Sequence, residues 1–310
     1  MTARILSYDD KAIAEAACLI ASGRPVAMPT ETVYGLAADA TNGEAVAAIY
    51  AAKGRPSFNP LIVHVLDREA AEAIADLPDA ARELARAFWP GPLTIVAPLK
   101  PDAPIAALAT AGLPTVALRS PAHLAMRDLL RVCARPLAAP SANASGTISP
   151  TRAAHVLRSL GRKIELIIDG GQTEVGLEST IVAIDGDRLR ILRPGPITAD
   201  QLAEASGLQV TTVTSDAIEA PGQLAQHYAP SKPVRLDATE ARDGEWLIGF
   251  GPVAGNVSLS SKGDLAEAAA RLFELLHQAD AGDAPSIAFA PVPDEGLGAA
   301  INDRLRRAAA

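Results

Sequence analysis

Residues 29–40 read PTETVYGLAADA, and this stretch decides how the rest of the chain is interpreted. It follows an apolar run, VAM at 26–28, that is typical of a buried strand. Thr30, Glu31 and Thr32 then stand where core residues would be expected. A turn needs only Gly, Asn or Asp, whereas threonine and glutamate are costly to bury without hydrogen-bond partners. The stretch therefore indicates polar side chains kept at a strand end for a reason other than turning the chain.

The composition indicates a globular protein of more than one part. The 310 residues exceed a typical single domain, which favours two domains or one domain with an appendage. Hydrophobic residues make up 49% and charged residues 21%, which is ordinary for a chain with a sizeable core. The formal net charge of −8 argues against nucleic-acid binding over the whole surface, because such proteins neutralise phosphates with excess Lys and Arg. A local basic cleft stays possible.

The cysteines and the apolar runs indicate the cellular compartment in which the protein is found. Cys18 and Cys133 each fall in a predicted helix without His or Cys at metal-ligand spacing, so neither a metal site nor a disulfide framework is predicted. We expect both thiols to be reduced and buried, as in a cytosolic protein. No basic leader precedes an apolar core, and no run approaches about 18 apolar residues. A cytoplasmic protein without membrane contact is predicted.

Helices alternate with short strands through the first two thirds of the chain. Helices are predicted at 8–22, 42–54, 67–76, 78–88, 122–133 and 149–161, and strands at 24–29, 60–66, 92–99, 115–121, 136–143, 164–171, 179–185 and 188–195. Ser149 and Pro150 are interpreted as the N-cap and first residue of the last of these helices. Closely spaced late strands favour antiparallel pairs, so the fold class is α/β with a mixed sheet.

The pattern weakens after about residue 205. Residues 206–233 show no period long enough for a core element and are predicted to be a linker. A strand in 244–251, a helix at 264–279, a strand in 285–292 and a final helix at 298–309 then predict a compact βαβ unit. We therefore expect a first domain at 1–205 and a smaller second domain at 234–310.

Two further stretches could carry chemistry. In KGRPSFNPL (53–61), Lys53 and Arg55 form either a solvated helix end or a preorganised cation pair. The two prolines favour the second, since rigid backbone lowers the entropy cost of holding cations for a polyphosphate. LAAPSANASGTISPT (137–151) is either a flexible loop or an anion site at a helix N-terminus. Its small residues, which allow close approach to the backbone, favour function.

Three strand residues are ambiguous by themselves. Arg119 and Arg193 end strands and are either surface residues or clamps for an anionic group. His64 alone is more often a hydrogen-bonded core histidine. The P-loop pattern is missing, and GFGPVAGN at 249–256 lacks both the spacing and the following helix of a dinucleotide fingerprint.

Six motifs in order resemble one family. They are PTETVYGL (29–36), KGRPSFNPLIVHV (53–65), TVALRSP (115–121), SANASGTISPT (141–151), LESTIV (177–182) and ILRPGP (191–196). Together they resemble the L-threonylcarbamoyladenylate synthases of the YrdC-like fold. HYAP (227–230) and GLGAAINDRLRRAA (296–309) resemble the linker and final helix of the long, two-domain form. The resemblance implies a YrdC-like twisted mixed sheet with helices, joined by an extended linker to a small Rossmann-like α/β domain.

The resemblance also implies site residues. The signature falls on Lys53, Arg55, Ser141 and Asn143; the ATP side on Arg55, Asn59, Thr115, Ser141, Ser149, Arg193 and Tyr228; and the threonine side on Thr32, His64, Arg119, the backbone of Ala139, and Ser179. One departure is visible in the linker, where the long form often carries a lysine and this chain has Gln223, Leu224 and Gln226.

The implied reaction makes L-threonylcarbamoyl-AMP from L-threonine, bicarbonate or CO2, and ATP, with release of pyrophosphate. Mg2+ would be held mainly by the phosphates, and the product would go to the machinery that modifies tRNA adenosine beside the anticodon. The linker with Tyr228 would act as a lid. Two alternatives stay open: a non-catalytic module that binds tRNA or double-stranded RNA, and a subunit of a carbamoyl-phosphate-dependent carbamoyltransferase, although the zinc-finger and acylphosphatase modules of such proteins are absent.

Overall fold

The computed structural model describes residues 2–212, 219–221 and 227–310. Its helices are α1 (Asp10–Ala21), α2 (Gly43–Lys53), α3 (Arg68–Glu72), α4 (Asp79–Phe88), α5 (Leu124–Cys133), α6 (Ala153–Leu160), α7 (Ala199–Ser206), α8 (Leu265–Ala281) and α9 (Leu297–Ala308). Its strands are β1 (Arg4–Ser7), β2 (Val26–Met28), β3 (Gly35–Asp39), β4 (Ile62–His64), β5 (Leu93–Pro98), β6 (Thr115–Arg119), β7 (Leu137–Ala138), β8 (Leu166–Asp169), β9 (Thr180–Asp185), β10 (Arg188–Arg193), β11 (Gln209–Thr212), β12 (Val234–Arg235), β13 (Glu245–Gly249), β14 (Val257–Ser258) and β15 (Ser286–Phe289).

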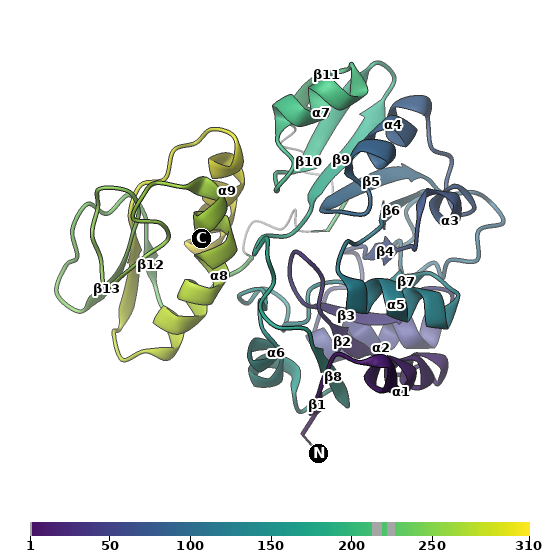
Figure 1. Cartoon of the computed structure of the whole chain (residues 1–310), viewed down its shortest axis with the longest axis horizontal. Helices are drawn as coiled ribbons and strands as arrows, with labels where there is room; N and C mark the ends of the chain where they lie inside the picture. Colours follow the sequence, from purple (N-terminus) through teal and green to yellow (C-terminus); the bar gives the residue numbers. More distant parts are fainter. Residues whose placement is uncertain (1, 213–218, 222–226) are drawn as a thin grey trace.

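The larger part is built on one mixed sheet. Its order is β1-β8-β2-β3-β7-β4-β6-β5-β9-β10-β11. β2 and β3 are antiparallel, β4 and β6 are parallel, and β9 and β10 form an antiparallel pair. In Figure 1 the sheet runs from β1 and β8 up to β10 and β11, with α1 and α5 beside its lower half. The predicted mixed α/β fold is confirmed.

Capping residues fix most helix boundaries where the sequence predicted them. Asp9 caps α1 by accepting from the Ala12 N–H at 2.7 Å, and Asn42 caps α2. Gly54, with a φ of 63°, ends α2 in the left-handed conformation that favours glycine.

The predicted start of a helix at Ser149 is wrong. α6 begins at Ala153 with Arg152 as its N-cap, because the Ser149 hydroxyl donates to the Glu178 carboxylate instead of capping a helix. Ser149 therefore does not place a helix N-terminus at the end of residues 137–151, where an anion was expected to bind.

The smaller part is a parallel sheet covered by two helices. Its strand order is β12-β15-β13-β14, and α8 and α9 lie on the side that faces the larger part (Figure 1). β11 pairs with β10 inside residues 206–233, for which the sequence predicted no regular element. The domain boundaries at 205 and 233 stay predictions.

The two parts share apolar packing. Val33, Ile148 and Leu177 of the larger part belong to the same buried cluster as Tyr228 and Phe273 of α8. The smaller part thus packs against the loop that carries PTETVY through this apolar cluster.

The prediction that both thiols are buried is wrong: Cys18 is exposed, Cys133 is half-buried, and both are free. Among the described helices, none combines the length and apolar character that crossing a membrane requires.

Candidate functional site

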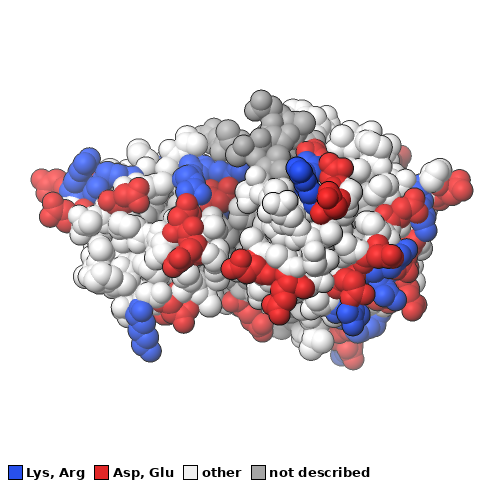
Figure 2. Space-filling model, turned by 90° about the horizontal axis from the view of Figure 1, so that it is seen from above, with Lys and Arg blue, Asp and Glu red and all other residues white. Residues whose placement is uncertain are grey.

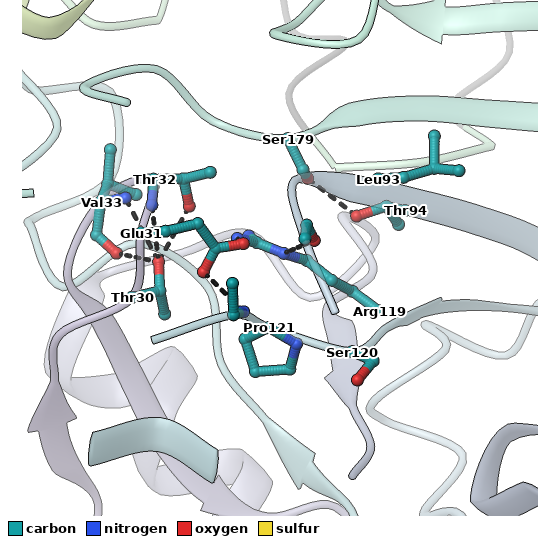
Figure 3. A network of polar contacts seen from close by, with 12 residues as sticks. Thr30, Glu31, Thr32, Val33, Leu93, Thr94, Arg119, Ser120, Pro121 and Ser179 are labelled. Carbon is teal, nitrogen blue, oxygen red and sulfur yellow. Dashed lines mark hydrogen bonds and ion pairs between the residues drawn. The ribbon is translucent and has the colours of Figure 1, made fainter. Parts of the chain in front are cut away.

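The stretch PTETVY forms the buried connection between β2 and β3. Residues 29–40 are all buried. The Thr30 hydroxyl donates to the Val33 carbonyl at 2.7 Å and lies 2.9 Å from the Thr32 hydroxyl (Figure 3). The loop packs closely at Gly35, since a Cβ there would lie 3.3 Å from that of Ala139, which is tighter than an ordinary contact. The loop is therefore a fixed wall and not a flexible turn.

Glu31 and Arg119 form a buried ion pair beside this wall. Arg119 Nη2 donates to Glu31 Oε1 at 2.6 Å and Arg119 Nε to the Gly91 carbonyl at 3.2 Å, while Glu31 Oε2 accepts from the Ala122 N–H at 3.0 Å (Figure 3). Burial alone would raise the pKa of the Glu31 carboxyl, but Arg119 outweighs burial and holds that pKa below its ordinary value. Arg119 Nη1 has no hydrogen-bond partner among the described residues.

Arg55 and Arg193 are held by neutral groups only. Arg55 Nη2 donates to Asn59 Oδ1 at 2.6 Å and to the Pro60 carbonyl at 2.8 Å. Arg193 Nη2 donates to the Ser179 carbonyl at 2.9 Å. Burial lowers the pKa of both guanidinium groups, that of Arg55 to about 10. Neither guanidinium group pairs with a carboxylate within the described ranges, so both groups can still bind an anion.

Lys53 supports this region from behind. Its ammonium donates to the Ser141 carbonyl at 2.5 Å and to the Asn143 carbonyl at 2.6 Å, and the side chain is buried. Burial first, and then Arg55, lowers the pKa of Lys53. The lysine does not line the pocket described next, which differs from the predicted phosphate contact. It ties the end of α2 to the loop that starts at Ser141.

One pocket collects residues from segments that lie far apart in the sequence. Its lining consists of Thr30, Thr32, Val33, Gly35, Arg55, Ile62, His64, Arg119, Ala139, Pro140, Ser141, Glu178, Ser179, Arg193, Pro221, His227 and Tyr228. The predicted residues Thr32, Arg55, His64, Arg119, Ala139, Ser141, Ser179, Arg193 and Tyr228 are thus brought together. Their individual roles stay predictions.

Five predicted residues lie outside this lining: Lys53, Asn59, Thr115, Asn143 and Ser149. Asn59 holds Arg55, and Asn143 Nδ2 donates to the Thr147 carbonyl at 2.8 Å. The hydroxyl of Ser149 donates to Glu178. Asn59 and Ser149 therefore stand behind pocket residues, whereas Asn143 braces its own loop.

Thr115 lies at the start of β6, four residues from Arg119. Because side chains alternate along a strand, Thr115, Ala117 and Arg119 share one face. Ala117 belongs to an apolar cluster with Ile62, Val96, Ile181, Ala183, Leu192 and Ala220. Since Ile62 also lines the pocket, this apolar face continues the pocket toward Thr115.

Several buried polar atoms in the pocket lack partners. His64 Nδ1, His227 Nδ1 and Tyr228 Oη make no hydrogen bond to the described residues. Burial lowers the pKa of His64 and of His227 to about 3, so both rings are neutral at pH 7. Buried polar groups are rarely left unpaired, and a bound ligand is a common explanation.

The sequence prediction assigned no role in this region to Glu178, His227 or Arg304. Glu178 lies in the hydroxyl-rich stretch LESTIV, whose likeness to PTETV was a usable signal. His227 was visible only as part of a linker motif. Arg304 of α9 carried no signal, because it is one of several arginines on an amphipathic helix.

The departure from the family's linker pattern at Gln223, Leu224 and Gln226 lies outside the described residues. Within the described ranges, no group of three or more His, Cys, Asp or Glu could hold a metal ion.

Comparisons with known proteins agree with the fold. The Sua5/YciO/YrdC family, described as "Telomere recombination", matches residues 18–195, and "Threonylcarbamoyl-AMP synthase, C-terminal domain" matches 197–310. Threonylcarbamoyl-AMP synthase of Bacillus subtilis (strain 168) is 40% identical over 98% of this chain and 94% of its own. A putative threonylcarbamoyl-AMP synthase of Mycobacterium tuberculosis is 39% identical over 66% of this chain and 93% of its own.

A solved structure extends the likeness to three dimensions. The crystal structure of Sua5 from P. abyssi complexed with L-threonine superposes with a TM-score of 0.90 at 37% identity, over 99% of this chain and 97% of the other. Both sheets are covered by this match. The chain therefore belongs to the threonylcarbamoyl-AMP synthase family.

Proposed function

We propose that this protein synthesises L-threonylcarbamoyl-AMP from L-threonine, bicarbonate or CO2, and ATP, with release of pyrophosphate. The observation that carries the proposal is the pocket in which Arg55, Arg193 and Arg119 converge with small hydroxyls. Two of these arginines lack a carboxylate partner among the described residues, so the pocket has buried positive charge that a polyphosphate would balance.

The phosphates would lie against Arg55 and Arg193. Their Nη1 atoms would contact phosphate oxygens, and Ser141 would add a hydroxyl. The base would continue along the apolar face that includes Ala117 and ends near Thr115. In this arrangement Lys53 and Asn59 act by holding Ser141 and Arg55 in place.

L-Threonine would bind in the pocket against the wall formed by PTETVY. Its carboxylate would accept from Arg119 Nη1, and Thr32, Ser179 and the unpartnered His64 Nδ1 lie ready for its polar groups. Because the pocket would hydrogen-bond the substrate hydroxyl, an analogue without it would be rejected strongly. The likeness to a relative solved with L-threonine supports this assignment.

The chemistry needs placement more than proton transfer. The threonine amine captures CO2 as a carbamate with release of a proton. A carbamate oxygen then attacks the α-phosphorus of ATP, the bond to the β-phosphate oxygen breaks, and pyrophosphate leaves. The arginines would stabilise charge that develops on the phosphates, and the shared pocket would supply the proximity.

Mg2+ would enter with ATP. Of the described residues that line the pocket, Glu178 alone is acidic, and both of its oxygens already accept hydrogen bonds. The lining thus fits a metal ion held mainly by phosphate oxygens, where it would neutralise phosphate charge.

The linker would act as a lid. Pro221, His227 and Tyr228 line the pocket, and Ala220 packs on the apolar face proposed for the base. Nucleotide entry would therefore displace this segment. Ending the chain after Gly207 is expected to abolish turnover or to release product that hydrolyses, and unchanged kinetics would remove the lid from the account.

We further propose that the reaction is cytoplasmic and that the product passes to the enzymes that modify tRNA adenosine beside the anticodon. Direct tRNA binding is not needed for this. On the face drawn in Figure 2, Lys and Arg stand beside Asp and Glu and form no continuous basic stripe, which favours synthesis over an RNA-binding module.

Pyrophosphate release from ATP tests the proposal. Release should require both L-threonine and bicarbonate, and L-serine should support it poorly. Equal release with serine, or none with threonine, would count against the proposal. Salt-sensitive RNA binding without ATP turnover would favour the RNA-binding alternative.

A further inference from the structure

A charged side chain from the smaller part lies directly behind residues that line the pocket. Arg304 projects from α9, one of the two helices of the smaller part that face the larger one (Figure 1), and it is 1% exposed. A buried guanidinium is costly unless its donors are satisfied. Its partners therefore show what this arginine does.

These partners adjoin residues of the pocket. Arg304 Nε donates to Glu178 Oε2 at 2.8 Å, and its Nη1 donates to the Pro194 carbonyl at 2.9 Å. Glu178 precedes Ser179 in the chain, and Pro194 follows Arg193. Arg304 thus fixes the backbone beside two residues that line the pocket.

The same helix holds the linker. The Arg304 guanidinium lies 5.2 Å from the centre of the Tyr228 ring, a cation–π contact, and the Arg307 carbonyl accepts from the His227 N–H at 3.3 Å. Tyr228 has a φ of 65°, which is unfavourable for a bulky residue and must be held by its surroundings. α9 supplies part of that hold.

Arg304 also sets the charge of the pocket. Burial alone would raise the pKa of the Glu178 carboxyl, but Arg304 and Arg193 outweigh burial and keep that pKa low. Glu178 is therefore charged. Arg304 also bonds Asp303 at 2.7 Å, but Asp303 has a second partner in Arg307. Without Arg304, the Glu178 charge would be balanced mainly by Arg193, and this would reduce the positive charge that Arg193 offers to a phosphate.

We propose that Arg304 is a positioning residue through which the C-terminal helix makes the pocket competent for ATP, by balancing Glu178 and by holding Tyr228. This inference rests on the proposed function. It gives the smaller part a direct effect on nucleotide affinity, beyond carrying one end of the linker.

A double-mutant cycle on the full chain tests the inference. Affinities for α,β-methylene-ATP and for L-threonine are measured by calorimetry for the wild type, R304M, E178Q and R304M/E178Q. R304M should weaken the nucleotide about 30-fold and threonine less than about threefold. Removing the Glu178 charge as well should recover about fivefold or more of the nucleotide affinity relative to R304M, which loss of packing alone would not do. R306M is the matched control, because Arg306 lies on the same helix with a side chain 59% exposed; its affinities should stay within about twofold of wild type.

Different results would contradict the role of Arg304 and the proposed function. Unchanged nucleotide affinity in R304M, or a double variant that binds no more tightly than R304M, overturns the role of Arg304. Failure of the wild type to bind the nucleotide overturns the proposed function itself. If R304M does not fold, R304K takes its place: it keeps the charge and should retain most of the nucleotide affinity, and a loss as large as about 30-fold in folded R304K would contradict the charge argument.

Discussion

The two walls of the pocket solve the burial of arginine in opposite ways. On the threonine wall, Arg119 is paired with a carboxylate of the protein, Glu31. On the nucleotide wall, Arg55 and Arg193 donate only to carbonyl, amide and hydroxyl oxygens. The first wall is nearly neutral without ligand, whereas the second keeps net positive charge.

This difference matches the two substrates. Threonine is a zwitterion, so a wall with balanced charge can orient it through one remaining N–H direction of Arg119. ATP brings several negative charges, and buried cations with neutral partners are poised to receive them. The Glu178 carboxylate would reduce the positive charge of the second wall, but Arg304 balances that carboxylate by pairing with it.

The largest difference between nucleotide affinity and threonine affinity is expected from R55A. It should weaken α,β-methylene-ATP about 100-fold, because the charge-assisted contact of Arg55 with the phosphates is lost, and should leave threonine affinity nearly unchanged. Calorimetry with each ligand measures both. R86A, which changes an exposed arginine of α4, is the control. Equal losses for both ligands would show that the walls are not separate.

The support under the nucleotide wall is tested by K53M. Two hydrogen bonds from a buried ammonium disappear, and two buried carbonyls lose partners, so the free energy of unfolding should fall by about 3 kcal/mol. Urea unfolding measures this change. Full stability together with lost nucleotide affinity would instead place Lys53 at the phosphates, as the sequence predicted.

The unpartnered histidines make stability depend on pH. His64 and His227 have a pKa of about 3 in the folded protein and about 6.5 when unfolded. The unfolded chain therefore binds more protons between these values, and stability falls as pH falls through this window. Each should contribute a loss of about 2 kcal/mol between pH 7 and pH 5. Urea unfolding at both pH values checks this, and H64Q should reduce the difference by its share; an unchanged difference in H64Q would contradict it.

The smallest effect is expected from E31Q. The amide keeps the shape and one acceptor for Arg119 but removes the balancing charge, so threonine should bind about threefold to tenfold more tightly. Nucleotide affinity should change less. Weaker threonine binding in folded E31Q would mean that the Glu31 charge is needed to hold Arg119 in position.

Motifs identified pocket-lining residues where these come from a strand end or a loop, although their roles stay predictions. Arg119, Arg193 and Ser179 are of this kind, and the mixed sheet followed from strand spacing. The sequence also placed α1 and α2 well, because Asp9, Asn42 and Gly54 are local signals.

Contacts between distant segments were not predictable. The Ser149 hydroxyl has two possible partners, a helix N-terminus or a carboxylate, and the choice of Glu178 depends on tertiary packing. Lys53 resembles a phosphate ligand in sequence, yet its ammonium reaches carbonyls near residue 142 that only the fold brings close. Arg304 pairs with Glu178 across 126 positions of the chain.

A crystal structure of the full chain with α,β-methylene-ATP, Mg2+ and L-threonine would show directly whether both substrates bind in this one pocket. We predict phosphate oxygens at Arg55 and Arg193, and the threonine carboxylate at Arg119, inside the same pocket. Phosphates bound elsewhere, with Arg55 and Arg193 still facing only neutral oxygens, would contradict it.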